Sequence, residues 1–179
     1  MPRNKKLLLV TSSYPDATSS ERSFVYPELL ELVAAGFEVT LMSVRPAVNI
    51  DPALPSGVCV SNELAASYRR IWSLLAIFDL FLRGEFWREL GERPRLIFRF
   101  RFWKDSLRAA ISARIFRKIK DRFDLFYTYW FSGETTGMNF AELAPVITRA
   151  HGYDLYLERR ENDGWIPYRH FNLSRIDKV

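Results

Sequence analysis

Residues 7–44 read LLLVTSSYPDATSSERSFVYPELLELVAAGFEVTLMSV, and this stretch decides the fold. Its first four residues form a continuous apolar run, which is typical of a central parallel strand covered on both faces. Residues 24–35 place apolar side chains at helical spacing, with Pro27 expected in the first turn, where proline is tolerated, and Gly36 at the C-cap. Residues 37–44 predict a second strand. Together these segments predict a right-handed βαβ unit.

The rest of the chain continues the α/β pattern. The expected elements are a strand at 58–60, two or more helices separated near 91–94 within a helical insertion at about 64–122, a strand at 124–131, a helix at 134–143, a strand at 146–150 and a helix at 167–176. We therefore expect residues 1–179 to form a single α/β domain, a parallel sheet with helices on both faces. Residues 177–179 resemble the opening of another strand, so we expect the chain to be truncated from a longer protein.

Composition describes an ordinary globular protein, with 48% hydrophobic and 26% charged residues. The single cysteine, Cys59, excludes an intrachain disulfide and is expected to be a buried, inert thiol. No cysteine or histidine cluster indicates a metal site. The longest apolar stretch, residues 71–82, contains Asp79 and is shorter than the ~20 residues that a spanning helix needs. We expect a cytoplasmic protein that at most lies on a membrane surface.

Two segments that follow expected strands are candidates for a binding site. His151 and Gly152 come after the apolar run 145–148, and ligands of open α/β sheets bind outside the carboxyl ends of the strands. The imidazole is therefore a candidate functional group, although a loop histidine can also simply hydrogen-bond nearby backbone. The loop at 11–22 contains no glycine, which excludes a dinucleotide fingerprint. Its hydroxyl groups either bind a polyhydroxylated ligand or cap the next helix.

Positive charge is concentrated between residues 93 and 122, which hold eleven Lys or Arg and two Asp. The expected helix there is aromatic and cationic, with Phe100 in its apolar stripe. Such a helix either lies on an anionic membrane or packs its aromatic side chains on the sheet while its arginines stay solvated. The residues expected to dock on a membrane are Arg99, Arg101, Lys104 and Arg108. No recognition motif supports nucleic-acid binding, so no nucleic-acid partner is expected.

One pair of acidic residues is not expected to be catalytic. Glu134 and Glu142 lie on the helix expected at 134–143. Helix capping and solvation explain both side chains.

Four segments carry a resemblance to a known family. They are the strand and loop 7–15 followed by 23–25, residues 28–40, the strand end at 129–131, and residues 148–156. Residues 28–40 are like the family's run E-x-x-x-L-x-x-x-G-H-E-V-T, with Phe37 in place of the usual histidine. In these segments the chain resembles the N-terminal half of family 4 glycosyltransferases of the GT-B type. It looks most like the bacterial enzymes that build extracellular polysaccharides.

The resemblance implies a Rossmann-like, acceptor-binding domain of a retaining, metal-independent transferase that acts at the inner face of the membrane. In the family a C-terminal domain with a paired-glutamate motif binds the nucleotide-sugar, and that motif would lie beyond Val179. The implied partners are therefore a nucleotide-sugar, a glycan or lipid-linked acceptor, and an anionic membrane surface, with no other cofactor. Without a C-terminal domain the chain is expected to be inactive.

The resemblance also implies roles for individual residues. His151 matches the histidine of the family's His-Gly-x-Asp motif and would orient or polarise the reacting sugar, with Gly152 and Asp154 in register. The residues expected to contact substrate are Ser12, Ser13, Tyr14, Trp130, Gly152 and Asp154. In relatives the loop after the first strand is often glycine-rich, so its lack of glycine here is a departure. The competing hypothesis is a non-catalytic α/β module that binds a membrane surface or a protein partner.

Overall fold

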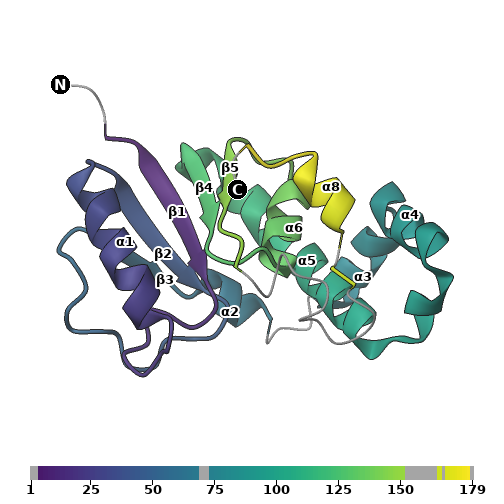
Figure 1. The fold of residues 1–179 in the computed structure, drawn as a ribbon, viewed down its shortest axis with the longest axis horizontal. Helices are drawn as coiled ribbons and strands as arrows, with labels where there is room; N and C mark the ends of the chain where they lie inside the picture. Colours follow the sequence, from purple (N-terminus) through teal and green to yellow (C-terminus); the bar gives the residue numbers. More distant parts are fainter. Residues whose placement is uncertain (1–3, 69–72, 152–164, 167, 178–179) are drawn as a thin grey trace.

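The computed structural model describes residues 4–68, 73–151, 165–166 and 168–177. Its centre is a five-stranded parallel sheet with strand order β3-β2-β1-β4-β5 (Figure 1). The strands are β1 (Lys6–Thr11), β2 (Glu38–Ser43), β3 (Cys59–Ser61), β4 (Leu125–Thr128) and β5 (Val146–Thr148). All five were predicted at nearly these positions, and the fold is α/β and Rossmann-like.

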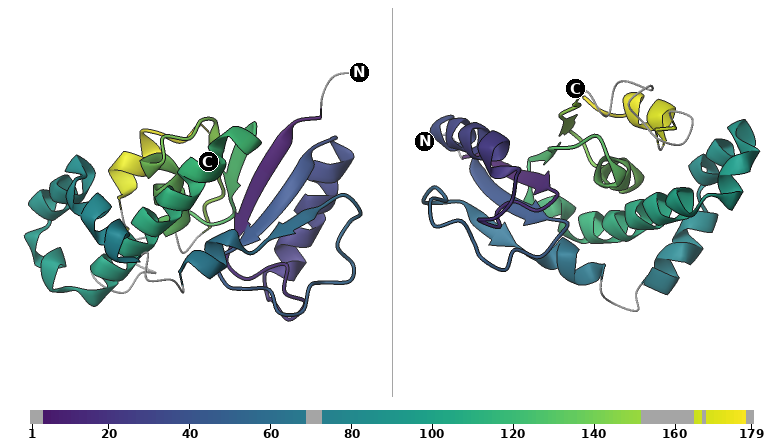
Figure 2. Two further views of the ribbon diagram at one scale, coloured as in Figure 1. Left: turned by 180° about the vertical axis from the view of Figure 1, so that it is seen from behind. Right: turned by 60° about the horizontal axis from the view of Figure 1, so that its bottom comes forward.

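Helices cover the sheet and extend beyond it. They are α1 (Arg22–Ala34), α2 (Glu63–Ser67), α3 (Ser73–Phe81), α4 (Gly84–Glu92), α5 (Phe100–Ile119), α6 (Gly133–Phe140) and α8 (Arg169–Leu173), with 3-10 turns η1 (Pro94–Phe98) and η2 (Lys120–Arg122). The segment from α2 to η2 connects β3 to β4. Within it, α3 and α4 lie away from the strands, at the end of the molecule opposite α1 (Figures 1 and 2).

The side chains of β1 alternate between two apolar cores. Leu7 and Leu9 pack with α1 on one face, whereas Leu8 and Val10 pack with α5 and α6 on the other, and all four are almost fully buried. Full burial of a leucine stabilises a fold by about 1.5–3 kcal/mol. The uninterrupted apolar run is therefore explained by helices on both faces of the sheet.

Helices α5 and α6 pack closely through a glycine. A Cβ atom added to Gly137 of α6 would lie 2.5 Å from the Cβ of Ser112 and 3.1 Å from the carbonyl oxygen of Ala109, both in α5. Ordinary contacts between carbon atoms are about 3.5–4.0 Å. The absence of a side chain at Gly137 therefore sets the spacing of the two helices.

Two expectations at the level of single residues are wrong. Helix α1 begins at Arg22 rather than near residue 24, because a turn from Ser19 leads directly into it, so Pro27 lies beyond the first turn. Cys59 is exposed, because it lies on the edge strand β3, which has a neighbouring strand on one side only.

The expected apolar stripe of α5 is also displaced at its start. Phe100 is the first residue of α5, and 83% of it is exposed. The fully buried face runs instead through Phe102, Ala109, Ala113 and Phe116. The helix contacts α6, α3 and α2, so its burial follows the neighbouring helices and not a single sheet-facing stripe.

The strand order places a crevice between β1 and β4. The chain proceeds from β1 to β2 and β3 on one side, then crosses back to β4 and β5 on the other. Connections that leave two adjacent strands in opposite directions open a crevice at their carboxyl ends, which is where ligands bind in such sheets.

Candidate functional site

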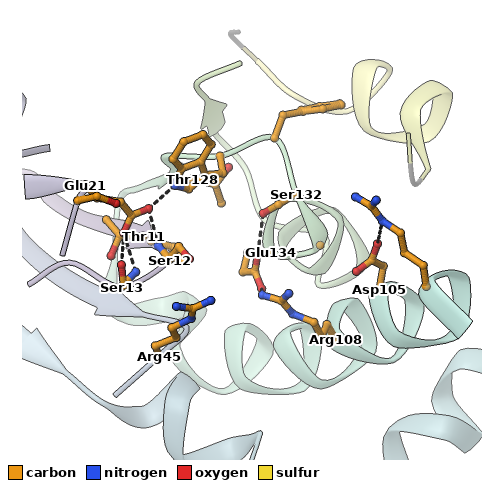
Figure 3. A pocket seen from close by; sticks show the side chains of 16 residues that line it. Thr11, Ser12, Ser13, Glu21, Arg45, Asp105, Arg108, Thr128, Ser132 and Glu134 are labelled. Atoms are coloured by element: carbon orange, nitrogen blue, oxygen red, sulfur yellow. Dashed lines mark hydrogen bonds and ion pairs between the residues drawn. The ribbon is translucent and has the colours of Figure 1, made fainter. Parts of the chain in front are cut away.

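A polar cavity of about 430 Å³ occupies this crevice (Figure 3). Its walls are the loop after β1, the segment from β4 into α6, and one side of α5, together with Arg45 after β2. The lining side chains that carry polar groups are Thr11, Ser12, Ser13, Ser20, Glu21, Arg45, Arg101, Asp105, Arg108, Thr128, Trp130, Ser132 and Glu134. We call this space the polar cavity.

Glu21 organises the loop after β1. Its carboxylate accepts hydrogen bonds from three successive backbone N–H groups, those of Ser12 (3.1 Å), Ser13 (2.6 Å) and Tyr14 (2.9 Å). The indole N–H of Trp130 donates to the same carboxylate. Successive N–H groups that converge in this way form an anion-binding nest. Here the N–H groups hold a buried carboxylate of the chain itself. The loop reaches this shape without glycine, because none of its residues has a positive φ.

Glu134 forms the wall on the opposite side. It accepts hydrogen bonds from Arg108 Nη2 at 2.9 Å, from Ser132 Oγ at 2.6 Å and from the Tyr68 hydroxyl at 3.1 Å. Only 4% of Glu134 is exposed. The expectation that solvation explains this residue is therefore wrong, because the first turn of α6 faces α5 and places Glu134 opposite Arg108 (Figure 3). A buried carboxylate normally has such a partner.

A third carboxylate, Asp105, lies further along α5. Burial raises the pKa of its carboxyl above the ordinary value, and the nearby positive charge of Arg101, whose Nε lies 3.6 Å from Asp105 Oδ2, opposes this shift. Carboxyls with a raised pKa inside a cavity are common at functional sites. Arg45 projects between the β1 loop and α5 (Figure 3), and none of the described carboxylates forms an ion pair with it.

His151 lies beside Trp130, which lines the polar cavity. Its Nε2 donates to the backbone carbonyl oxygen of Tyr129 at 3.2 Å, and its ring lies over the Trp130 indole, with 4.2 Å between ring centres. The imidazole is partly exposed, but His151 is not among the residues that line the cavity. Gly152 and Asp154, expected beside it, lie outside the described residues.

The other expected substrate contacts are divided. Ser12, Ser13 and Trp130 line the polar cavity. Tyr14 does not line it, because its side chain is fully buried and its hydroxyl donates to Asp51 at 3.3 Å. Burial also raises the pKa of the Tyr14 phenol above its usual range.

The hydroxyl groups of the loop after β1 form hydrogen bonds mostly with other groups of the same loop. Ser13 Oγ and Ser19 Oγ lie 2.7 Å apart, and no side chain caps the N-terminus of α1. The capping role considered for this loop is therefore not observed at the N-cap residue Glu21, although Ser19 Oγ accepts a hydrogen bond from the Glu21 N–H at 3.2 Å in the turn that leads into α1.

The residues expected to dock on a membrane lie at different places in the structure. Arg101 and Arg108 line the polar cavity, and Lys104 and Arg108 line a neighbouring apolar groove. Arg99 immediately precedes α5. Four charged cavity residues were absent from the predicted site: Glu21, Arg45, Asp105 and Glu134.

No protein-family model matches the chain, and no curated protein matches it by sequence. Among the described residues, no helix is long and apolar enough to cross a membrane. The same part of the chain contains no group of three or more His, Cys, Asp or Glu side chains placed to hold a metal ion.

Proposed function

We propose that this domain is the acceptor-binding half of a retaining glycosyltransferase that transfers a sugar from a nucleotide-sugar to a glycan or lipid-linked acceptor in polysaccharide biosynthesis. The observation that supports this proposal is the polar cavity at the carboxyl ends of β1 and β4, where open α/β sheets bind ligands. The resemblance of the sequence to family 4 glycosyltransferases points to the same activity.

The cavity offers the groups that a phosphorylated sugar requires. Carboxylates such as Glu134 and Asp105 accept hydrogen bonds from sugar hydroxyls, and guanidinium groups such as Arg45 donate to phosphate. The Trp130 indole adds an apolar face on which a sugar ring packs. A few polar groups that converge in a concave site are the usual basis of ligand orientation.

Trp130 also connects the cavity to His151. In the proposed enzyme His151 orients the reacting sugar, and its hydrogen bond to the Tyr129 carbonyl fixes the direction of the imidazole. If the reading frame supplies a nucleotide-sugar domain with a paired-glutamate motif, His151→Ala should lower kcat while the protein stays folded. Full activity of this variant would assign the histidine to a structural role.

Ligand binding tests the site without a second domain. Glucose 1-phosphate or a nucleotide-sugar should shift the indole N–H signal of Trp130 in nuclear magnetic resonance spectra. Arg45→Ala should weaken this binding, whereas Lys118→Ala, which removes an exposed charge elsewhere, should not. A panel of sugar phosphates that leaves the Trp130 signal unchanged would contradict the proposal.

The helical insertion supports a position at the inner face of the membrane. Nine of the fourteen large apolar side chains exposed in the described structure lie between residues 75 and 100, and Phe98 and Phe100 are 90% and 83% exposed. Exposed apolar side chains beside basic residues are typical of surfaces that bind anionic membranes. The same surface would also suit the competing hypothesis, a non-catalytic interaction module.

Vesicle binding tests this surface. Replacing Phe98 and Phe100 by serine should reduce sedimentation with phosphatidylglycerol vesicles, because their apolar area no longer enters the lipid. Phe24→Ser, which changes an exposed phenylalanine on α1, is the matched control and should sediment normally. Equal sedimentation of all variants would contradict membrane docking. Vesicle binding without any sugar-phosphate binding would favour the interaction module.

A further inference from the structure

A second cavity lies beside the polar cavity and has the opposite character. It occupies about 860 Å³ between α3 and α5, within the range of about 300–1,000 Å³ that ligand pockets span. Its walls include the apolar side chains Val44, Ile77, Leu80, Trp103, Leu107 and Ile111. We call it the apolar groove.

The two cavities are adjacent and share part of their walls. Ser12, Arg45 and Arg108 line both of them, so the boundary between polar and apolar walls falls at these residues. A ligand that crosses this boundary would place a polar part against the β1 loop and α6. Its apolar part would lie between α3 and α5.

Positive charge is concentrated on the wall of the apolar groove, and Arg45 and Arg108 also line the polar cavity. Arg45, Lys104 and Arg108 contribute three cations to the wall of the apolar groove, and no described acidic side chain lines it. Arg108 is paired with Glu134. No described carboxylate forms an ion pair with Arg45 or Lys104, so both cations are available to an anion.

We propose that the apolar groove binds the apolar chain of a lipid phosphate, with its phosphate against Arg45 and Lys104. The sugar carried by that phosphate then extends into the polar cavity. This inference rests on the proposed function for the sugar and narrows the acceptor to a lipid-linked one. Charge complementarity favours this ligand, because Arg45 and Lys104 are exposed cations at the groove wall and no described acidic side chain lines the groove.

Binding of farnesyl phosphate, measured below its micelle concentration, tests the inference. We expect farnesyl phosphate to bind about 30-fold or more tightly than dimethylallyl phosphate. A fully buried CH₂ group tightens binding by about fourfold, so burial of a few additional groups of the longer chain is enough for this difference. Inorganic phosphate and farnesol should each bind much more weakly than farnesyl phosphate. Equal affinity for the long and short chains would overturn the inference.

Two kinds of variant separate the groove from the rest of the surface. Leu107→Trp fills the groove and should remove the preference for the longer chain, and Ile77→Asp should do the same by placing a charge in its wall. Lys104→Glu should weaken binding about tenfold through repulsion of the phosphate. Lys118→Glu makes the same charge change at an exposed position of α5 away from the groove and is the control.

The outcomes also separate the groove from the membrane surface and from the proposed function. Binding that is lost in Phe98→Ser but unchanged in Leu107→Trp would mean adsorption to the aromatic surface and would overturn the inference. Sugar-phosphate binding at Trp130 with no gain from a prenyl chain would overturn the groove but leave the proposed function intact. A gain from the chain that depends on Leu107, without any sugar binding, would support the groove and contradict the proposed function.

Discussion

Replacing Gly137 by alanine tests the close packing of α5 on α6. The added Cβ would lie 2.5 Å from Ser112 Cβ, about 1 Å inside ordinary contact, so the helices must move apart. Overpacking of this kind costs about 1–3 kcal/mol, and the higher helix propensity of alanine offsets up to about 1 kcal/mol. We expect a net loss of about 1–2 kcal/mol in the free energy of unfolding.

Urea denaturation followed by circular dichroism measures this loss. With a slope of about 2 kcal/mol per molar urea, the midpoint should fall by about 0.5–1 M, and Tm should fall by about 2–8 °C. Gly91→Ala is the matched control, because nothing lies within 4 Å of a Cβ added there and the change should be neutral or stabilising. A second test is Ser112→Gly, which removes the closest atom and should reduce the cost of Gly137→Ala in the double variant.

Gly137→Ala should also affect the polar cavity. The same two helices carry Arg108 and Glu134, whose 2.9 Å ion pair forms a wall of the polar cavity. Separation of the helices should therefore weaken sugar-phosphate binding in Gly137→Ala. If Gly137→Ala matches Gly91→Ala in stability, the packing argument is refuted.

Three further predictions concern single side chains. Glu21→Ala should lower the free energy of unfolding by about 2–3 kcal/mol and shift the Trp130 indole signal, because four buried or part-buried N–H donors lose their acceptor. An effect as small as that of Glu31→Ala, an exposed change on α1, would contradict this. Burial raises the pKa of Asp105, so its ionisation destabilises the folded state as pH rises through that pKa, and below about pH 4 the carboxyl is neutral in both states. Asp105→Asn should therefore gain stability relative to the wild type from about pH 4 to pH 7, and the reverse trend in thermal melts would refute the assignment. Cys59 is exposed, so a thiol reagent should label it in the native protein as fast as in urea, and protection would contradict the edge position.

The sheet could be predicted because its signals are local. The apolar run at residues 7–10 and the Gly36 C-cap lie within one βαβ unit, where periodicity and turn chemistry agree. The burial of individual side chains was less predictable. Phe100 follows helical spacing but lies at the start of α5, before the neighbouring helices cover that face. Helical spacing predicts which residues share a face of the helix. It does not predict where along the helix the neighbouring elements begin to bury that face.

The candidate site was only partly predictable because its contacts span long distances in sequence. Ser12 and Ser13 lie in the loop after the apolar run 7–10, and Trp130 lies in the strand end at 129–131, and both segments carry the resemblance that identified these residues. Glu21 hydrogen-bonds Trp130 across more than a hundred residues. Glu134 accepts a hydrogen bond from Arg108, which lies on another helix. In the sequence such carboxylates are indistinguishable from solvated ones, because the neighbouring residues do not indicate the distant residue that each carboxylate will contact.

The carboxylate of Glu21 in the backbone nest has a consequence for ligand recognition. The loop after β1 is already held in one conformation, so its chain entropy is lost during folding and not during association. A preorganised loop improves affinity without adding any contact to the ligand. The nest is also closed to an incoming anion, so a phosphate group entering this crevice must be recognised by side chains such as Arg45 and not by the amides of the loop.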